Sequence, residues 1–147
     1  MKKLAVCLLA GWAAWQVSAA DDNWLTDLSK AQAKAKDEKK MVLVDFNGSD
    51  WCPPCKALRK DVLNSPEFVE YAKKNLVLVD VDFPRQKQIS ADQKAANEKL
   101  AKKYKVDGFP TIILLSSDGK QLEKKVGYGG ETTKEFIAGI EKVKGKT

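Results

Sequence analysis

Two cysteines separated by two prolines are the residues of this chain best suited to chemistry. Cys52-Pro53-Pro54-Cys55 follows an apolar run from Met41 to Phe46 after a short polar turn. A C-x-x-C at a strand-to-helix junction places the first sulfur at the first turn of a helix and the second sulfur one turn further in. Unpaired backbone N–H groups at a helix start favour an anion, so Cys52 is expected to ionise more readily than a free thiol. The pattern predicts thiol–disulfide exchange.

The first twenty residues have the features of a secretory signal peptide. A positive start, Met1-Lys2-Lys3, precedes an apolar stretch from Leu4 to Val17 and the small residues Ser18-Ala19-Ala20. A membrane anchor is the alternative, but the apolar stretch is short for a span of ~20 residues. We therefore expect cleavage near Ala20 and export, to the periplasm of a bacterium.

Cleavage would leave only two cysteines in residues 21–147, because Cys7 departs with the signal. A purely structural disulfide between Cys52 and Cys55 is the alternative to a redox pair. The chain-entropy argument disfavours it, because a four-residue ring stabilises a fold by only ~2 kcal/mol, against about 4.7 kcal/mol for a 100-residue loop. The close spacing therefore favours a redox-active pair.

The composition excludes several other kinds of site. The chain has no histidine, and two sulfurs without imidazole make a poor zinc or copper site, so no metal and no other cofactor is expected. The formal net charge is +6, but the lysines are interleaved with acidic residues along the chain. This arrangement is typical of a solvated surface and does not indicate nucleic-acid binding.

Periodicity and turn residues predict eight elements in a single domain. Asn23 is expected to cap a first helix that includes Trp24. Ser90 is expected to cap a later helix with Ala96, Leu100 and Tyr104 on its buried side. The other predicted elements are strands at 41–46, 76–81, 111–115 and 121–126, helical segments after 53 that break at 65–66, and a last helix opened by the capping box at 132–135. The order α-β-α-β-α-β-β-α predicts an α/β fold with a mixed sheet flanked by helices.

Three features together resemble the thioredoxin superfamily. They are the strand leading into Trp51-Cys52-Pro53-Pro54-Cys55-Lys56, the segment Gly108-Phe109-Pro110-Thr111, and the closing hairpin with its helix. Within that superfamily the chain resembles exported bacterial thioredoxin-like proteins and the soluble periplasmic domain of thiol:disulfide interchange proteins. The resemblance implies a thioredoxin fold with a mixed sheet of four strands, or of five.

The resemblance also implies roles for particular residues. Pro110 would follow a cis peptide bond and, with Trp51 and Phe109, line an apolar groove for substrate backbone. Asp45 is the candidate for the family's buried proton-relay acid, although it lies seven residues before Cys52. The alternative for Asp45 is an acid that accepts hydrogen bonds from loop N–H groups.

The predicted function is that of an exported thiol:disulfide oxidoreductase, mainly a disulfide reductase. Cys52 would attack a substrate disulfide and Cys55, expected to be the more buried, would resolve the mixed disulfide. The alternatives are a disulfide oxidase or isomerase, and a thioredoxin-fold binding or chaperone module with vestigial redox activity. The expected partners are protein dithiols or disulfides and a membrane-bound electron donor, and we expect a monomer.

Overall fold

The computed structural model describes residues 23–146 of the 147-residue chain. The predicted signal peptide lies outside the described residues. Within residues 23–146, no helix is both long enough and apolar enough to cross a membrane.

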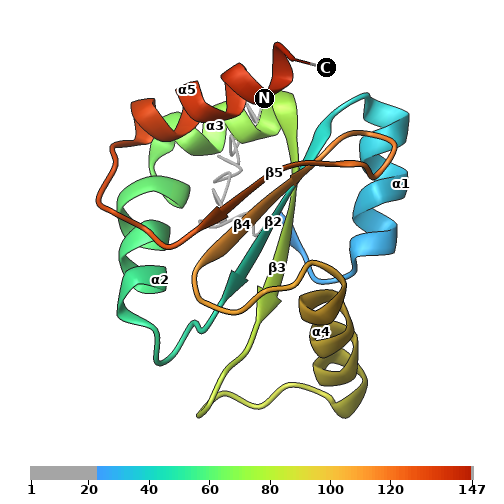
Figure 1. Cartoon of the computed structure of the whole chain (residues 1–147), viewed down its shortest axis with the longest axis vertical. Helices are drawn as coiled ribbons and strands as arrows, with labels where there is room; N and C mark the ends of the chain where they lie inside the picture. The colour runs from blue at the N-terminus through green and yellow to red at the C-terminus, as the bar shows by residue number, and fades with distance from the viewer. Residues whose placement is uncertain (1–22, 147) are drawn as a thin grey trace, which may run out of the picture.

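A five-stranded mixed sheet forms the centre of the molecule (Figure 1). Its strands are β1 (Trp24–Leu25), β2 (Met41–Asn47), β3 (Leu76–Asp82), β4 (Thr111–Leu115) and β5 (Gln121–Val126), in the spatial order β1-β3-β2-β4-β5. The pairings of β3 with β1 and β2 are parallel, whereas β4 pairs antiparallel with β2 and with β5. The prediction of a mixed sheet is confirmed, with five strands.

Helices cover both faces of this sheet (Figure 1). They are α1 (Leu28–Glu38), α2 (Pro53–Leu58), the π-helical turn η1 (Arg59–Leu63), α3 (Pro66–Asn75), α4 (Ala91–Lys103) and α5 (Thr133–Lys144). On one face α1 packs against Val42, Val44 and Phe46 of β2. On the other face α2, α3 and α5 pack against Leu43 and its neighbours. Because side chains alternate along a strand, Asp45 lies on the same face as Leu43, beneath α2.

The first predicted helix begins later than its apolar residues suggested. Asp27 is the N-cap, and its carboxylate accepts hydrogen bonds from the N–H groups of Ser29 and Lys30. Trp24 and Leu25 instead form the edge strand β1, paired with Leu78 and Val79. The prediction that Asn23 caps this helix was wrong because two residues beside an existing strand can satisfy their backbone groups by pairing.

The predicted buried side of α4 is confirmed at Leu100 and Tyr104, which pack in the core, but is wrong at Ala96. Ser90 is the N-cap as expected, but Ala96 is exposed and Asn97 is buried. The side-chain amide of Asn97 donates a hydrogen bond to the backbone carbonyl of Asp82, at 2.8 Å. A polar side chain thus fastens α4 to the end of β3, which hydrophobic periodicity cannot reveal.

The predicted break in the helices after the cysteines is confirmed. The chain leaves the π-helical turn at Asn64, and Ser65 caps α3 by accepting a hydrogen bond from the N–H of Phe68. The capping box at the start of α5 is also present, between Thr132 and Glu135. These caps fix where α3 and α5 begin, and both helices pack on the face of the sheet that includes Leu43.

Candidate active site

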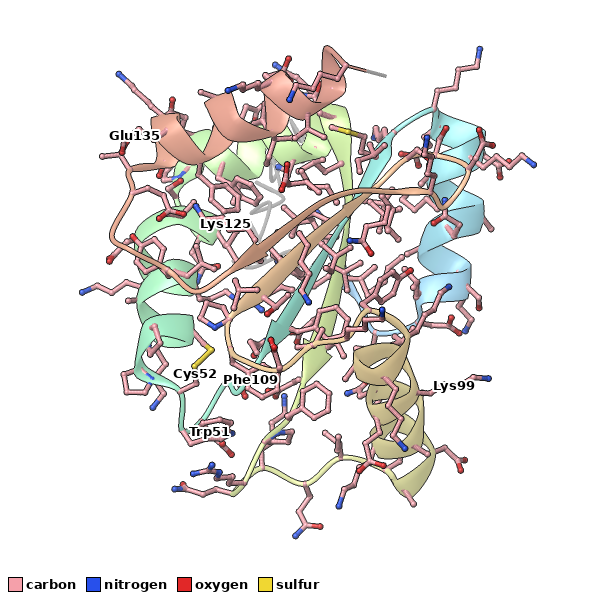
Figure 2. All side chains as sticks on the ribbon, in the orientation of Figure 1. Trp51, Cys52, Lys99, Phe109, Lys125 and Glu135 are labelled. Atoms are coloured by element: carbon pink, nitrogen blue, oxygen red, sulfur yellow. A yellow bond between two sulfur atoms is a disulfide. The ribbon has the colours of Figure 1, made fainter. Side chains whose placement is uncertain are left out.

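Cys52 and Cys55 are joined by a disulfide at the start of α2 (Figure 2). Their Cα atoms are 5.3 Å apart, and Cys52 is the N-cap residue of the helix. The backbone N–H of Cys52 donates to the carbonyl of Gly48 at 2.9 Å, and its carbonyl accepts from the N–H of Lys56 at 3.1 Å. The first sulfur therefore stands at the helix entrance and the second one turn inside, as the spacing predicted.

The two cysteines are almost equally buried. Cys52 is 3% exposed and Cys55 is 5% exposed. The prediction that Cys55 is the more buried of the two is therefore wrong in this disulfide state.

The two prolines reduce the stabilisation that the start of α2 can give to a thiolate at Cys52. Pro53 and Pro54 occupy the first two positions of α2. Proline has no backbone N–H, so two of the donors that normally lie unpaired at a helix start are absent here. The N–H of Cys55 is the first one that the helix offers to an anion at its entrance.

Trp51 lies beside the cysteines (Figure 2). Its indole N–H donates to the carbonyl of Phe83 at 2.7 Å, and its ring meets that of Phe109 edge-on at 5.9 Å between centroids. The ring also lies across the backbone of Gly48, where an added Cβ would come within 2.4 Å of the indole. The guanidinium carbon of Arg85 stands 3.8 Å from the ring centroid on the solvent side. Glycine at 48 is therefore required for this placement of Trp51.

Phe109 and Pro110 lie at the same end of the sheet as Trp51. The Phe109–Pro110 peptide bond is cis, and Pro110 is buried at the entrance to β4. The carbonyl of Pro110 accepts a hydrogen bond from the N–H of Gly127 at 2.8 Å. The ring of Phe109 packs on Phe83 at 5.2 Å and on Trp51, so the structure brings the three residues predicted to line the groove to one end of the sheet.

Asp50 connects the cysteine loop to the segment after β3. Its carboxylate accepts hydrogen bonds from the backbone N–H groups of Arg85, Gln86 and Lys87, at 2.7–3.0 Å. These bonds lower the pKa of Asp50 to about 2. An ionised Asp50 thus holds the segment that carries Phe83 and Arg85 against Trp51.

Asp45 is a buried carboxylate among polar partners. It is 2% exposed, and its Oδ2 accepts a hydrogen bond from Nη2 of Arg59 at 2.8 Å. The same guanidinium nitrogen lies 3.1 Å from Oδ1 of Asp80, which faces Asp45 across the β2–β3 pairing. The amide nitrogen of Asn47 lies 2.7 Å from Oδ1 of Asp80 and 3.3 Å from Oδ2 of Asp45. Asp45 is therefore bonded by side chains of the fold rather than by loop N–H groups.

Burial raises the pKa of Asp45 to about 7. Removal from water is the largest cause, and the negative charges of Asp80 and Asp82 act in the same direction. The positive charge of Arg59 opposes them and limits the rise. A carboxyl group that titrates near neutral pH is suited to accept or release a proton during a reaction.

Sequence reasoning missed several residues of this site. Arg59 and Asp80 complete the surroundings of Asp45, and Phe83 and Arg85 complete those of Trp51. One signal was present in the sequence, because Asp80 and Asp82 alternate with valines in a strand that is otherwise apolar. In residues 23–146, no group of three or more histidine, cysteine or acidic side chains is placed to hold a metal ion.

The sheet order, the helix layers and the C-x-x-C at the entrance to α2 define the thioredoxin fold, and comparisons with known proteins agree. A family model described as a thioredoxin-like domain matches residues 28–144. Disulfide bond reductase DsbH of Chlamydia pneumoniae is 34% identical over 108 residues, which are 74% of this chain and 64% of that relative. The chain therefore spans just under two thirds of the length of that relative.

Solved structures show the same relationship. A DsbH oxidoreductase superimposes with a TM-score of 0.76 at 29% identity, covering 82% of each chain. The C-terminal domain of DsbD from Neisseria meningitidis, in its oxidised form, gives a TM-score of 0.58 at 26% identity over 78% of this chain and 91% of that domain. The chain belongs to the thioredoxin-like family, and the resemblance and fold predicted from its sequence are confirmed.

The burial of Asp45 predicts an unusual dependence of stability on pH. The pKa of Asp45 is about 7 in the folded protein, whereas an aspartate in an unfolded chain has a pKa near 3.9. The folded state therefore binds the additional proton, so its contribution is complete below about pH 4 and is lost as the pH rises through about 7. Asp45→Asn, which stays neutral, should gain stability over the wild type between pH 4 and pH 8, on the order of a few kcal/mol.

Urea unfolding of both proteins across this pH range measures the difference. Asp118→Asn, at an exposed turn, is the matched control and should follow the wild type throughout. A difference between Asp45→Asn and the wild type that stays constant from pH 4 to pH 8 would contradict a neutral Asp45 in the folded protein.

Proposed function

We propose that this chain is an exported thiol:disulfide oxidoreductase that acts mainly as a disulfide reductase. The observation that carries the proposal is the Cys52–Cys55 pair, which closes a disulfide at the entrance of α2 beside Trp51 and the cis Phe109–Pro110 bond. A structural disulfide with this four-residue ring would stabilise the fold by only ~2 kcal/mol. The names of the relatives, a disulfide bond reductase and a DsbH oxidoreductase, support the same reading.

The reaction begins from the reduced pair. The Cys52 thiolate attacks one sulfur of a substrate disulfide, and the other substrate sulfur leaves as a thiolate that takes a proton from solvent. Cys55 then attacks Cys52, breaks the mixed disulfide and releases the second substrate thiolate. Two electrons have passed from the cysteine pair to the substrate, and the Cys52–Cys55 bond seen in the structure is the oxidised product.

Asp45 accepts the proton that Cys55 loses before it attacks. Its carboxyl group is buried on the sheet face beneath α2, the helix that carries Cys55. With a pKa of about 7, it is ionised in a substantial fraction of molecules at neutral pH and can return the proton when the pair is reduced again.

The prolines between the cysteines support the reducing direction. A thiol–disulfide pair becomes more oxidising when its reduced form, with an ionised first cysteine, is stabilised. Pro53 and Pro54 withhold two backbone N–H groups from the Cys52 thiolate, and the chain has no histidine that would stabilise it. The disulfide state of the enzyme is thereby favoured relative to the dithiol, which is the condition for donating electrons to substrates.

Trp51, Phe109 and Pro110 receive the substrate. Their side chains lie together beside the disulfide, held by the indole–Phe83 hydrogen bond and the ring contacts. An extended protein segment with its own disulfide would lie against this apolar surface while its sulfur meets Cys52. The substrates are therefore proteins with accessible disulfides.

The cellular setting follows from the sequence at the N-terminus. Residues 1–20 act as a signal peptide that is cleaved near Ala20, and residues 21–147 act as a monomer in the bacterial periplasm. A reductase in an oxidising compartment needs a supply of electrons, so a membrane-bound reductant regenerates the Cys52–Cys55 dithiol.

The intact mass of the protein recovered from the periplasm tests the export step. A mass that begins at Asp21 is the expected result, because the small residues before it are typical of a cleavage site. A mass that retains Cys7, or that includes an attached lipid, would contradict a soluble exported protein.

The order of the two cysteines gives the sharpest test of the mechanism. Cys55→Ser should accumulate mixed disulfides with substrate proteins, because the attack that resolves them is lost, whereas Cys52→Ser should accumulate none. Both variants should lose at least about 100-fold in the rate of insulin reduction. Non-reducing electrophoresis measures the trapped species, and mixed disulfides that accumulate only in Cys52→Ser would reverse the assigned roles.

The effect of the prolines on direction can be measured directly. Pro54→Ala restores a backbone N–H near the Cys52 sulfur, so the reduced form should gain stability and the disulfide should become easier to reduce, by up to about tenfold in equilibrium constant. Equilibration with glutathione buffers gives this constant. Pro66→Ala, the same change at the start of α3, is the control and should leave the constant unchanged.

A further inference from the structure

Arg59 holds a position that the exchange reaction described above leaves without a role. It is the first residue of the π-helical turn η1, one helical turn beyond Cys55, and both residues line the same surface cavity. A π-helical turn inside a helix frequently marks a functional position, because the wider turn changes the direction of a side chain. Here it accompanies an arginine that reaches from the helix to the sheet.

The arginine side chain is held between two carboxylates. Nη2 lies 2.8 Å from Oδ2 of Asp45 and 3.1 Å from Oδ1 of Asp80. The indole of Trp24, on the edge strand β1, lies under the guanidinium, with 4.2 Å from its carbon to the ring centroid. Asn47 bridges the same two carboxylates from β2. Three contacts therefore fix where Arg59 places its charge, and Asn47 holds the two carboxylates that make two of them.

One oxygen of Asp45 is left open by this arrangement. Oδ2 takes the bonds from Arg59 and Asn47, while the buried Oδ1 has no hydrogen-bond partner among the described residues. A buried carboxylate oxygen without a donor is costly for the fold, and it is the atom available to a proton.

We propose that Arg59 is a positioning residue for the exchange reaction: by holding Oδ2 of Asp45 and sharing its charge with Asp80, it sets the fraction of Asp45 that is ionised and leaves Oδ1 open to accept the proton of Cys55. This inference rests on the proposed function, because it deals with the same cysteine pair. It also gives a role to Asp80, Asn47 and Trp24, which hold Arg59 and Asp45 in place.

The charges around Asp45 act in opposite directions. From the π-helical turn, Arg59 favours the ionised carboxylate, whereas Asp80 and Asp82 of β3 disfavour it. From β4, the residue paired with Asp45 is Ile112, which carries no charge, and α2 above this face carries Cys55. Removing Arg59 must therefore move the titration of Asp45 to higher pH, and removing the charge of Asp80 must move it to lower pH.

The test follows the Asp45 carboxyl carbon by ¹³C NMR from pH 4 to pH 9, together with single-turnover insulin reduction over the same range. We expect Arg59→Met to move both the NMR midpoint and the rising limb of the rate upward by about one pH unit or more. Asp80→Asn should move both downward, and Arg59→Lys should restore most of the wild-type profile. Lys60→Met removes the same charge one residue further along and is the matched control, with no movement expected.

A merely structural role for Arg59 would not produce opposite movements in the two variants. Midpoints that do not move in Arg59→Met, or that move in the same direction in Arg59→Met and Asp80→Asn, would overturn the proposal. If Arg59→Met fails to fold, Arg59→Gln, which also removes the charge, gives the same comparison of sign with Asp80→Asn. If the wild type reduces no disulfide at any pH, the proposed function fails, while the NMR midpoints still decide whether Arg59 controls Asp45.

Discussion

The parallel, in-register pairing of β2 with β3 is the constraint on which the site depends. Asn47 at the end of β2 lies opposite Asp82 at the end of β3, so both loops leave the sheet at the same edge. The loop after β2 leads to the cysteines, and the segment after β3 begins with Phe83, whose N–H donates to the carbonyl of Asn47 at 2.9 Å. The antiparallel β4 enters at this edge as well, with Thr111 opposite Phe46. Three segments far apart in the sequence therefore meet around one disulfide.

The same register creates an electrostatic problem, because it places Asp45 directly beside Asp80. Two neighbouring carboxylates in a site removed from water raise the free energy of the doubly ionised state. An apolar pair at these two positions would pack without that cost. Arg59 relieves the repulsion only in part, since its single contact nitrogen is shared between the two carboxylates. A fold selected for stability alone gains nothing from this arrangement, whereas a reaction that moves a proton gains an acid that titrates near pH 7.

How much of this could be predicted from the sequence depends on the range of the interactions. The apolar runs of β2, β3 and β4, the break at Ser65 and the cap at Thr132 are local patterns, and all were found in the structure. The strand at Trp24 was missed because two residues have no periodicity, and their state is decided by the neighbouring edge of β3. Asp45 could be proposed from the sequence as the buried acid, but its surroundings could not be predicted. Its partners Arg59 and Asp80 lie 14 and 35 residues further along the chain. Arg59 and Asp80 acquire meaning only when the register of the strands and the widened turn of the helix are known.

The surfaces beside the cysteines are held by contacts that do not include the disulfide. The indole of Trp51 occupies the space that a side chain at Gly48 would fill, and its N–H bonds the carbonyl of Phe83. Asp50 holds residues 85–87, after β3, through three backbone N–H groups. None of these contacts includes a sulfur of Cys52 or Cys55. The four-residue ring adds little to the stability of the fold. The free energy of reducing the Cys52–Cys55 disulfide then depends mainly on the ionisation of its two sulfurs and of Asp45. The contacts that hold the surroundings of the site are thus distinct from the cysteine pair, so the fold does not depend on the disulfide to keep these segments together.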